Sequence, residues 1–121
     1  MKRPGTKASL TELRDALRRF ADARDWQQFH TPKNLAMALS VEAAELLEHF
    51  QWLTAEQCRC LNARTKTAVG EEIADVLLYL TRLADVLEID PVAAVRRKMK
   101  INARKYPVRR ARGNARKYNA G

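Results

Sequence analysis

Residues 35–53 read LAMALSVEAAELLEHFQWL, and residues 69–87 read VGEEIADVLLYLTRLADVL. At about 100° per residue, the apolar side chains of each stretch gather on one side of a helix. The first stretch places Leu35, Leu39, Leu46, Phe50 and Leu53 there, and the second places Val69, Ile73, Val76, Leu80, Leu83 and Leu87. Neither stretch alternates as a β-strand would. The two stretches therefore predict amphipathic helices in an all-α fold.

Start and stop signals extend this prediction along the chain. Ser9 with Glu12 and Thr54 with Gln57 have the spacing of capping boxes, and Thr31-Pro32 and Asp90-Pro91 pair a capping residue with proline. Pro107 disfavours helical geometry in the residue before it. We expect long helices at about 10–24, 32–52, 66–88 and 91–105, a short helix after Thr54, a polar joint at about 62–65, and an extended or disordered arm from Val108 to Gly121.

The chain length of 121 residues fits one domain, with a core at about 9–106 and a basic arm at 107–121. The net charge of +9 is concentrated at the C-terminal end. Residues 1–95 hold 12 basic and 14 acidic residues, whereas residues 96–121 hold 11 basic and no acidic ones. Such a tail favours an anionic partner, which is nucleic acid, an acidic membrane surface or the phosphates of a small substrate. Charge alone does not choose among them.

The sequence also predicts the cellular location of the protein. No run reaches the roughly 18 consecutive apolar residues of a membrane span, and the N-terminal MKRPGTKAS leads into a charged helix. Cys58 and Cys60 form a lone C-x-C without a second pair to complete a zinc site. We therefore expect a cytoplasmic protein without a membrane partner, with both cysteines as reduced thiols.

Two pairs of acidic residues interrupt the apolar pattern. Glu42 and Glu45 lie three residues apart on one predicted helix, and Glu72 and Asp75 on the other. Side chains at this spacing stand one turn apart on the same side, so two antiparallel helices bring four carboxylates together. Oxygen ligands of this kind suit Mg²⁺. The alternative is a solvated acidic surface, or carboxylates paired with the abundant arginines.

The order of the motifs resembles that of the MazG-like all-α nucleoside triphosphate pyrophosphatases. The acid pairs Glu42-x-x-Glu45 and Glu72-x-x-Asp75 are separated by 26 residues. They lie among RDWQQFHTPKNL (24–35), VEAAELLEHFQW (41–52), EEIADVLLYL (71–80), and KMKINARKYPV (98–108) with its basic RG…KY tail. This setting is similar to the branch of the family that acts on dCTP, over about residues 10–119.

The resemblance implies a four-helix-bundle core assembled as a dimer or a dimer of dimers (a homotetramer). It implies hydrolysis of a nucleoside triphosphate, dCTP or a modified dCTP, to monophosphate and pyrophosphate in sanitation of the nucleotide pool. The implied Mg²⁺ ligands are Glu42, Glu45, Glu72 and Asp75, with Glu42 or Glu45 as catalytic base. The residues implied to bind substrate are Trp26, His30, Trp52, Tyr79, Lys98 and Asn102.

Each substrate-binding assignment has a simpler alternative. Either tryptophan stacks on a base or packs in the core, and His30 is otherwise an ordinary loop histidine. Lys98 shares a helix face with Asn102 but also belongs to a basic run, and Tyr79 packs between helices if it does not line the site.

The main rival function is a nucleic-acid-binding helical protein, which explains the basic tail but leaves the four acidic residues without a purpose. The second rival is a structural helical bundle that serves only as an interaction module. Leu78 and Val86 lie away from the main apolar stripe, so we also expect a homo-oligomer.

Overall fold

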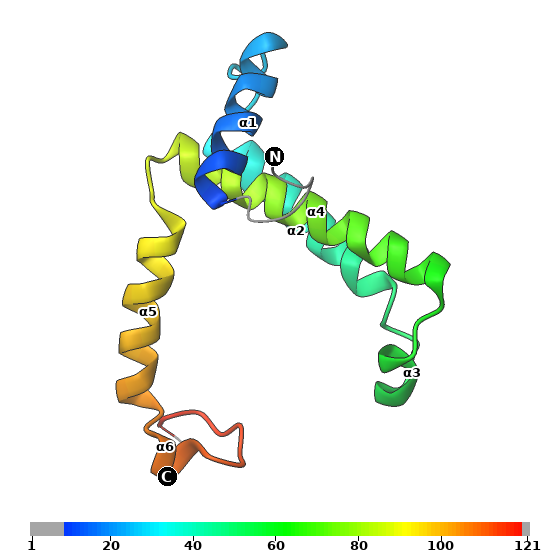
Figure 1. Ribbon diagram of the computed structural model, residues 1–121, viewed down its shortest axis with the longest axis vertical. Coiled ribbons are helices and arrows are strands. Elements are labelled where there is room, and N and C mark those ends of the chain that lie inside the picture. The colour runs from blue at the N-terminus through cyan, green and yellow to red at the C-terminus, as the bar shows by residue number, and fades with distance from the viewer. Residues whose placement is uncertain (1–8, 120–121) are drawn as a thin grey trace, which may run out of the picture. The chain divides into compact units, whose positions relative to one another are not determined.

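The computed structural model describes residues 9–119, and they form helices without any strand (Figure 1). The all-α prediction is confirmed. Residues 1–8, which include most of the N-terminal sequence quoted above, and residues 120–121 of the arm lie outside the described residues. The helices are α1 Leu10–Ala23, α2 Pro32–Glu48, α3 Ala55–Arg59, α4 Ala63–Val86, α5 Pro91–Lys105 and α6 Val108–Ala111.

The predicted capping residues begin their helices. The side-chain oxygens of Ser9 and Thr31 accept hydrogen bonds from backbone N–H groups three residues on, at 3.1 and 3.2 Å. Thr54 and Gln57 form the complete reciprocal capping box, and Asp90 accepts from two N–H groups at the start of α5. Each cap satisfies donors that have no partner within the helix, so local sequence fixes these starts.

Other predicted boundaries were wrong. The structure ends α2 at Glu48 and not at Trp52, because residues 49–53 form turns that lead into the extended backbone of the Thr54 cap. The helix α4 begins at Ala63, three residues before its predicted start. Asn62 belongs to no flexible joint, since its side chain accepts from Thr65 N–H at 2.8 Å and caps α4.

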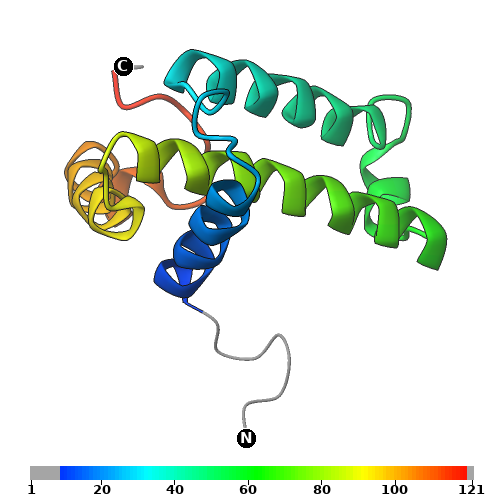
Figure 2. The same cartoon turned by 90° about the horizontal axis from the view of Figure 1, so that it is seen from above.

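By its contacts, the chain divides into two compact units, Met1–Glu88 and Ile89–Gly121. In the first, α2 and α4 run alongside each other in opposite directions, and α1 packs across α4 (Figure 2). Leu35, Val69 and Ala21 form the small buried core of this unit. The arrangement places the second half of α2 against the first half of α4, which are the two segments that carry the acid pairs.

The predicted apolar stripe of α4 divides into two parts. Val69 is buried and Val76 and Leu83 are half-buried, whereas Ile73 and Leu80 remain 52% and 47% exposed. Gly70, Ile73, Leu77 and Leu80 share an arc of roughly 80° at helical spacing, which we name the outer arc of α4. A Cβ added to Gly70 would meet nothing within 4 Å. The first unit therefore leaves an apolar helix face uncovered.

The second unit holds α5, α6 and a loop over residues 112–119. The prediction of an extended or disordered arm was wrong for residues 108–119. Four of them form α6, and Gly113, with φ of 80°, turns the chain after it. Asn114 donates to the Arg110 carbonyl at 2.9 Å and accepts from Arg116 N–H at 3.1 Å, which holds the loop. Among the helices of residues 9–119, none is long and apolar enough to cross a membrane.

Candidate metal centre

Three carboxylates meet between α2 and α4. Glu42, Glu45 and Glu72 each offer an oxygen within 4.8 Å of the others. Glu42 and Glu45 stand one turn apart on α2, and Glu72 faces them from α4, because the antiparallel pairing brings these segments together. We name these three residues the acid cluster. The structure thus brings together three of the four predicted metal ligands in one chain.

Within residues 9–119, no cationic side chain is paired with the acid cluster. One carboxylate oxygen of Glu42 and one of Glu72 are buried and have no hydrogen-bond partner. None of the salt bridges among the described residues involves the cluster. A buried carboxylate without a partner is costly, so the arrangement fits a bound cation. Carboxylate oxygens are ligands that Mg²⁺ accepts, together with water and substrate phosphates.

The mutual proximity of these groups changes their acidity. Interaction with Glu45 acts to lower the pKa of Glu42, but interaction with Glu72, burial and the charge of Asp75 outweigh it and raise that pKa. The pKa of Glu45 is raised as well, first by its interaction with Glu42. Asp75 is absent from the close group, although its charge reaches Glu42. Carboxylates with raised pKa values hold protons more readily, as a general base requires.

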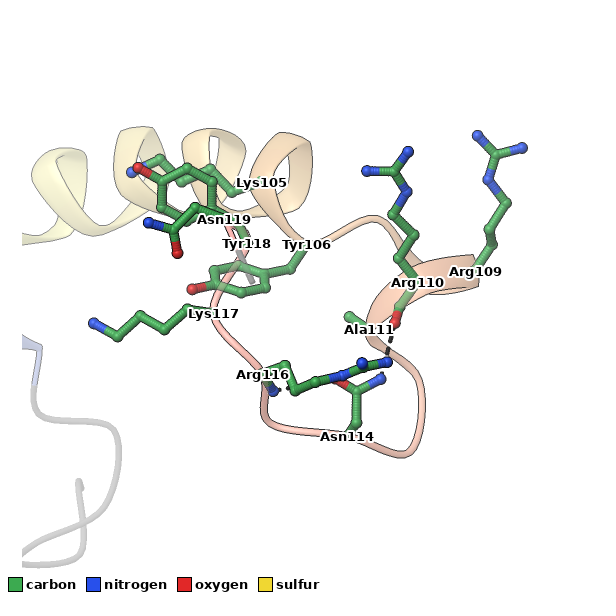
Figure 3. A pocket seen from close by; sticks show the side chains of 10 residues that line it. All are labelled: Lys105, Tyr106, Arg109, Arg110, Ala111, Asn114, Arg116, Lys117, Tyr118 and Asn119. Atoms are coloured by element: carbon green, nitrogen blue, oxygen red, sulfur yellow. Dashed lines mark hydrogen bonds between the residues drawn. The ribbon is translucent and has the colours of Figure 1, made fainter. Parts of the chain in front are cut away.

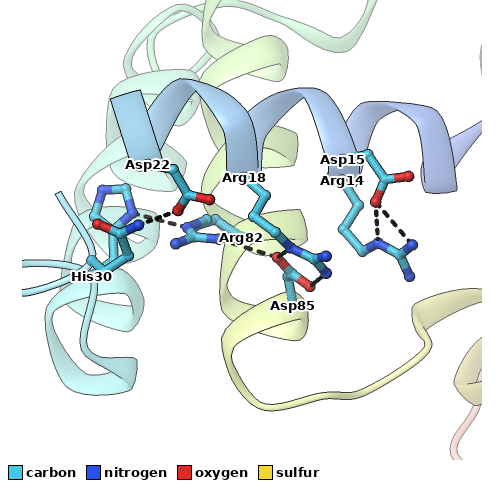
Figure 4. A network of polar contacts seen from close by, with 8 residues as sticks. Arg14, Asp15, Arg18, Asp22, His30, Arg82 and Asp85 are labelled. Atoms are coloured by element: carbon cyan, nitrogen blue, oxygen red, sulfur yellow. Dashed lines mark hydrogen bonds and ion pairs between the residues drawn. The ribbon is translucent and has the colours of Figure 1, made fainter. Parts of the chain in front are cut away.

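A second polar network lies at the other end of α4, where α1 packs (Figure 4). Arg18 and Arg82 both donate to the Asp85 carboxylate, at 3.0 and 3.1 Å between donor and acceptor. Arg82 also donates from Nε to His30 Nδ1 at 3.0 Å. We name these four residues the arginine network. Here each charge has an opposite partner, and interaction with Arg18 is the main reason that the pKa of Asp85 is lowered.

The arginine network fixes the state of His30. Burial, followed by the positive charge of Arg82, lowers the pKa of His30. Since arginine only donates, His30 Nδ1 must accept, which leaves the ring neutral with its proton on Nε2. His30 therefore presents an N–H donor on the side of the ring away from Arg82. This network was not predicted from the sequence, in which the available signal was a charged residue, Arg82, within the apolar stretch 76–87.

The two tryptophans lie at opposite ends of α2. Trp26 contacts Phe20 and His30 edge to face, with ring centroids 5.7 and 6.0 Å apart, in the link before α2. Trp52 follows α2 and is 87% exposed. A helix of 17 residues is about 25 Å long, so the two rings do not enclose one base within a single chain. Trp52 lies at the end of α2 nearer the acid cluster.

The remaining predicted residues fall into both units. Tyr79 is half-buried on α4, one turn beyond Asp75 and on the same flank as Glu72. Lys98 and Asn102 are exposed and one turn apart on α5, in the second unit. Lys98 borders a shallow depression on α5 together with Ala94 and Ile101.

Comparison with known proteins agrees with this arrangement. The model of the MazG-like family matches residues 37–120, which include both acid pairs. The chain belongs to the MazG-like family. It is 44% identical to human dCTP pyrophosphatase 1 over 112 residues, which are 91% of this chain and 66% of that protein. It is 42% identical to the bovine dCTP pyrophosphatase 1 over 115 residues, which are 93% of this chain and 68% of that protein.

A solved structure agrees with this result in three dimensions. The crystal structure of a pyrophosphatase from Archaeoglobus fulgidus superposes with a TM-score of 0.78 and 51% sequence identity. The match covers 88% of this chain and 99% of that one. The MazG-like all-α fold is therefore confirmed. The chain spans about two thirds of the length of the curated relatives it matches.

Proposed function

We propose that the protein hydrolyses a nucleoside triphosphate to the monophosphate and pyrophosphate, with dCTP or a close pyrimidine relative as substrate. The observation that carries this proposal is the acid cluster, whose buried oxygens lack partners in a chain of the MazG-like family. The names of its relatives support dCTP as substrate and release of pyrophosphate as the reaction. Removal of damaged or surplus nucleotides from the pool is the corresponding role, and the cytoplasm its place.

Mg²⁺ is the proposed cofactor, held by Glu42, Glu45, Glu72 and Asp75. When bound, it neutralises charge on the phosphate oxygens of the substrate. A glutamate of α2, Glu42 or Glu45, takes the proton from the water that attacks the α-phosphorus, and the raised pKa values of both suit this step. Pyrophosphate then leaves, and no covalent intermediate with the protein is needed.

The rest of the site positions the nucleotide. Trp52 offers an open ring for stacking beside the acid cluster, and Trp26 and His30 offer a ring and an N–H donor at the other end of α2. Tyr79 lies one turn beyond Asp75, on the side of α4 that carries Glu72. Lys98 and Asn102 contact sugar and phosphates. Because the two tryptophans lie at opposite ends of one helix, a complete base site takes residues from two chains.

A dimer or tetramer follows from the same geometry. The outer arc of α4 exposes Ile73, Leu77 and Leu80, and Gly70 beside them leaves room for close approach of another helix. A second copy of the chain covers this face in our proposal. Light scattering of the wild type should give the mass of two or four chains, and Leu77→Glu should lower it. A monomeric wild type at micromolar concentration would contradict the proposed assembly.

A turnover screen tests the activity. Common and modified nucleotides are incubated with and without Mg²⁺, and pyrophosphate is separated from phosphate as product. We expect pyrophosphate, and dCTP or a modified dCTP among the best substrates. Glu71→Gln is the matched control for substitutions in the acid cluster. Glu71 is exposed and next to Glu72, but it does not belong to the cluster. Absence of metal-dependent turnover with every nucleotide would refute the proposal.

A further inference from the structure

The C-terminal arm forms a cavity that the proposed reaction leaves without a role. It has a volume of about 540 Å³ and lies between the end of α5, α6 and the loop 112–119 (Figure 3). Five cationic side chains border it, those of Lys105, Arg109, Arg110, Arg116 and Lys117. A volume of this size lies in the range of small-molecule sites. All of these residues belong to the second compact unit, so the cavity lies within that unit.

No side-chain carboxylate of the described residues pairs with these cations. Asp90, at the first end of α5, is the last acidic residue in the sequence. Among the residues that the structure describes, Arg109, Arg110, Arg116 and Lys117 have no side-chain hydrogen bond and no ion pair. Figure 3 shows the Arg109 and Arg110 side chains extending from α6 while Arg116 lies along the loop. Unpaired cations gathered around one cavity raise the local concentration of anions.

The backbone around the cavity is held in place. Asn114 bonds to residues on both sides of the turn, and Tyr106 and Tyr118 contact each other edge to face with ring centroids 6.1 Å apart. Lys105 places its ammonium group 4.8 Å from the centre of the Tyr118 ring. The loop therefore returns to the end of α5, and the five cationic residues line one cavity formed by a single short segment of chain. The half-exposed tyrosine rings also provide an apolar wall.

We infer that this cavity binds a short phosphate chain, that of inorganic pyrophosphate or of a nucleotide. Arginine matches phosphate oxygens with paired donors, and several arginines around one cavity suit several linked phosphates. Duplex or single-stranded nucleic acid needs a groove or stripe that follows its backbone, and a cavity lined only by residues 105–119 favours the small anion. The inference needs neither the acid cluster nor Mg²⁺, so it can fail or hold independently of the proposed reaction.

Calorimetric titration of the full chain with pyrophosphate, in EDTA and at low salt, tests this site. The wild type should bind, and the double variant Arg110→Gln/Arg116→Gln should bind roughly 100-fold more weakly, at about tenfold for each charge-assisted contact. The control double variant Arg96→Gln/Lys100→Gln removes the same charge from α5 outside the cavity and should change affinity less than about threefold. Glu72→Gln should bind pyrophosphate as the wild type does. Circular dichroism checks that each variant is folded.

Three outcomes would overturn the inference. They are no binding by the wild type, equal weakening in both double variants, and tighter binding of a single-stranded oligonucleotide that both double variants weaken alike. The last would identify a nucleic-acid surface. Titration with dCTP distinguishes the two ligands that fit the inference, inorganic pyrophosphate and a nucleotide. Equal affinity for dCTP and pyrophosphate indicates the phosphate chain alone, whereas tighter dCTP binding that Tyr106→Ala removes indicates a nucleotide with its base on the tyrosine.

Discussion

The acid cluster and the arginine network each include residues of α4, near its two ends, but they differ in how buried charge is balanced. In the arginine network, Asp85 lies between Arg18 and Arg82, and Arg82 also donates its Nε–H to His30. In the acid cluster, Glu42 and Glu72 each keep a buried oxygen without a partner. The first network is complete within the protein and stabilises the packing of α1 on α4. The second is incomplete until a cation binds, which is expected of a site and not of a core.

The largest expected effect is on catalysis. Glu42→Gln and Asp75→Asn should each lower Mg²⁺-dependent turnover by more than about 100-fold, since even residues that only support metal ligands change activity by 10- to 100-fold. Helix content should stay unchanged, because each substitution removes a charge that forms no ion pair with any described residue. Turnover at low millimolar Mg²⁺, beside circular dichroism, checks both expectations. Near-normal turnover by either variant would remove that residue from the metal site.

The arginine network should show the reverse behaviour. Asp85→Asn leaves Arg82, whose side chain is only 7% exposed, without its ion pair. We expect a loss of about 2–3 kcal/mol in the free energy of unfolding, somewhat below the range for fully buried pairs because Arg18 reaches solvent. Urea denaturation measures this loss. Arg18→Gln is the matched control and should cost less than about 1 kcal/mol, since that side chain is 48% exposed. Equal losses in both variants would show that the buried Arg82 gains no more stability from Asp85 than the exposed Arg18 does.

An intermediate effect is expected at the end of α2. Trp52→Ala should raise KM by roughly five- to 150-fold, corresponding to one stacking contact of about 1–3 kcal/mol, with little change in kcat. Because stacking accepts any base, KM for dCTP and dUTP should rise by similar factors. Trp52→Phe keeps a ring at this position and should recover part of the loss. An unchanged KM in a folded Trp52→Ala variant would make this tryptophan a packing residue.

Sequence predicted the parts of the structure that local chemistry determines. Ser9, Thr31, Thr54 and Asp90 cap their own helices, so their role is readable from neighbours three residues away. The acid cluster was predicted because two helices with i, i+3 carboxylates meet when they pack antiparallel. Both inferences need only periodicity and one assumption about pairing.

Other features depend on partners that periodicity does not identify. Ile73 and Leu80 were placed on one apolar side of the helix with Val69, but the described residues leave them about half exposed. The bond between Arg82 and His30 joins residues 52 positions apart, and no local pattern indicates it. The arm was expected to be irregular because it is rich in arginine, glycine and asparagine, whereas Asn114 bonds on both sides of Gly113 and gives it a defined turn.

The smallest expected effect concerns pH and distinguishes the two networks without any substrate. The raised pKa of Glu42 means that the folded protein binds this proton more tightly than the unfolded chain, whose ordinary value is 4.5. The stability gained from that proton is complete below about pH 4.5 and is lost as pH rises through the raised value. The Glu42→Gln variant has no charge at this position, so its stability does not fall in this way as pH rises.

In EDTA, the Tm of Glu42→Gln should therefore exceed that of the wild type by a margin that grows from pH 4.5 to pH 8, to roughly a few degrees. The contributions of His30 and Asp85, whose pKa values are also displaced, are common to both proteins and cancel in the difference. The pKa of Glu45 is raised first by Glu42, so its return toward the ordinary value in the variant adds to the margin. Excess Mg²⁺ at pH 8 should shrink or reverse the margin, because the ion stabilises only the chain that keeps the carboxylate. A margin that is constant with pH would mean that Glu42 is as well solvated as an ordinary surface glutamate, and that the contrast with the arginine network does not extend to the metal-free protein.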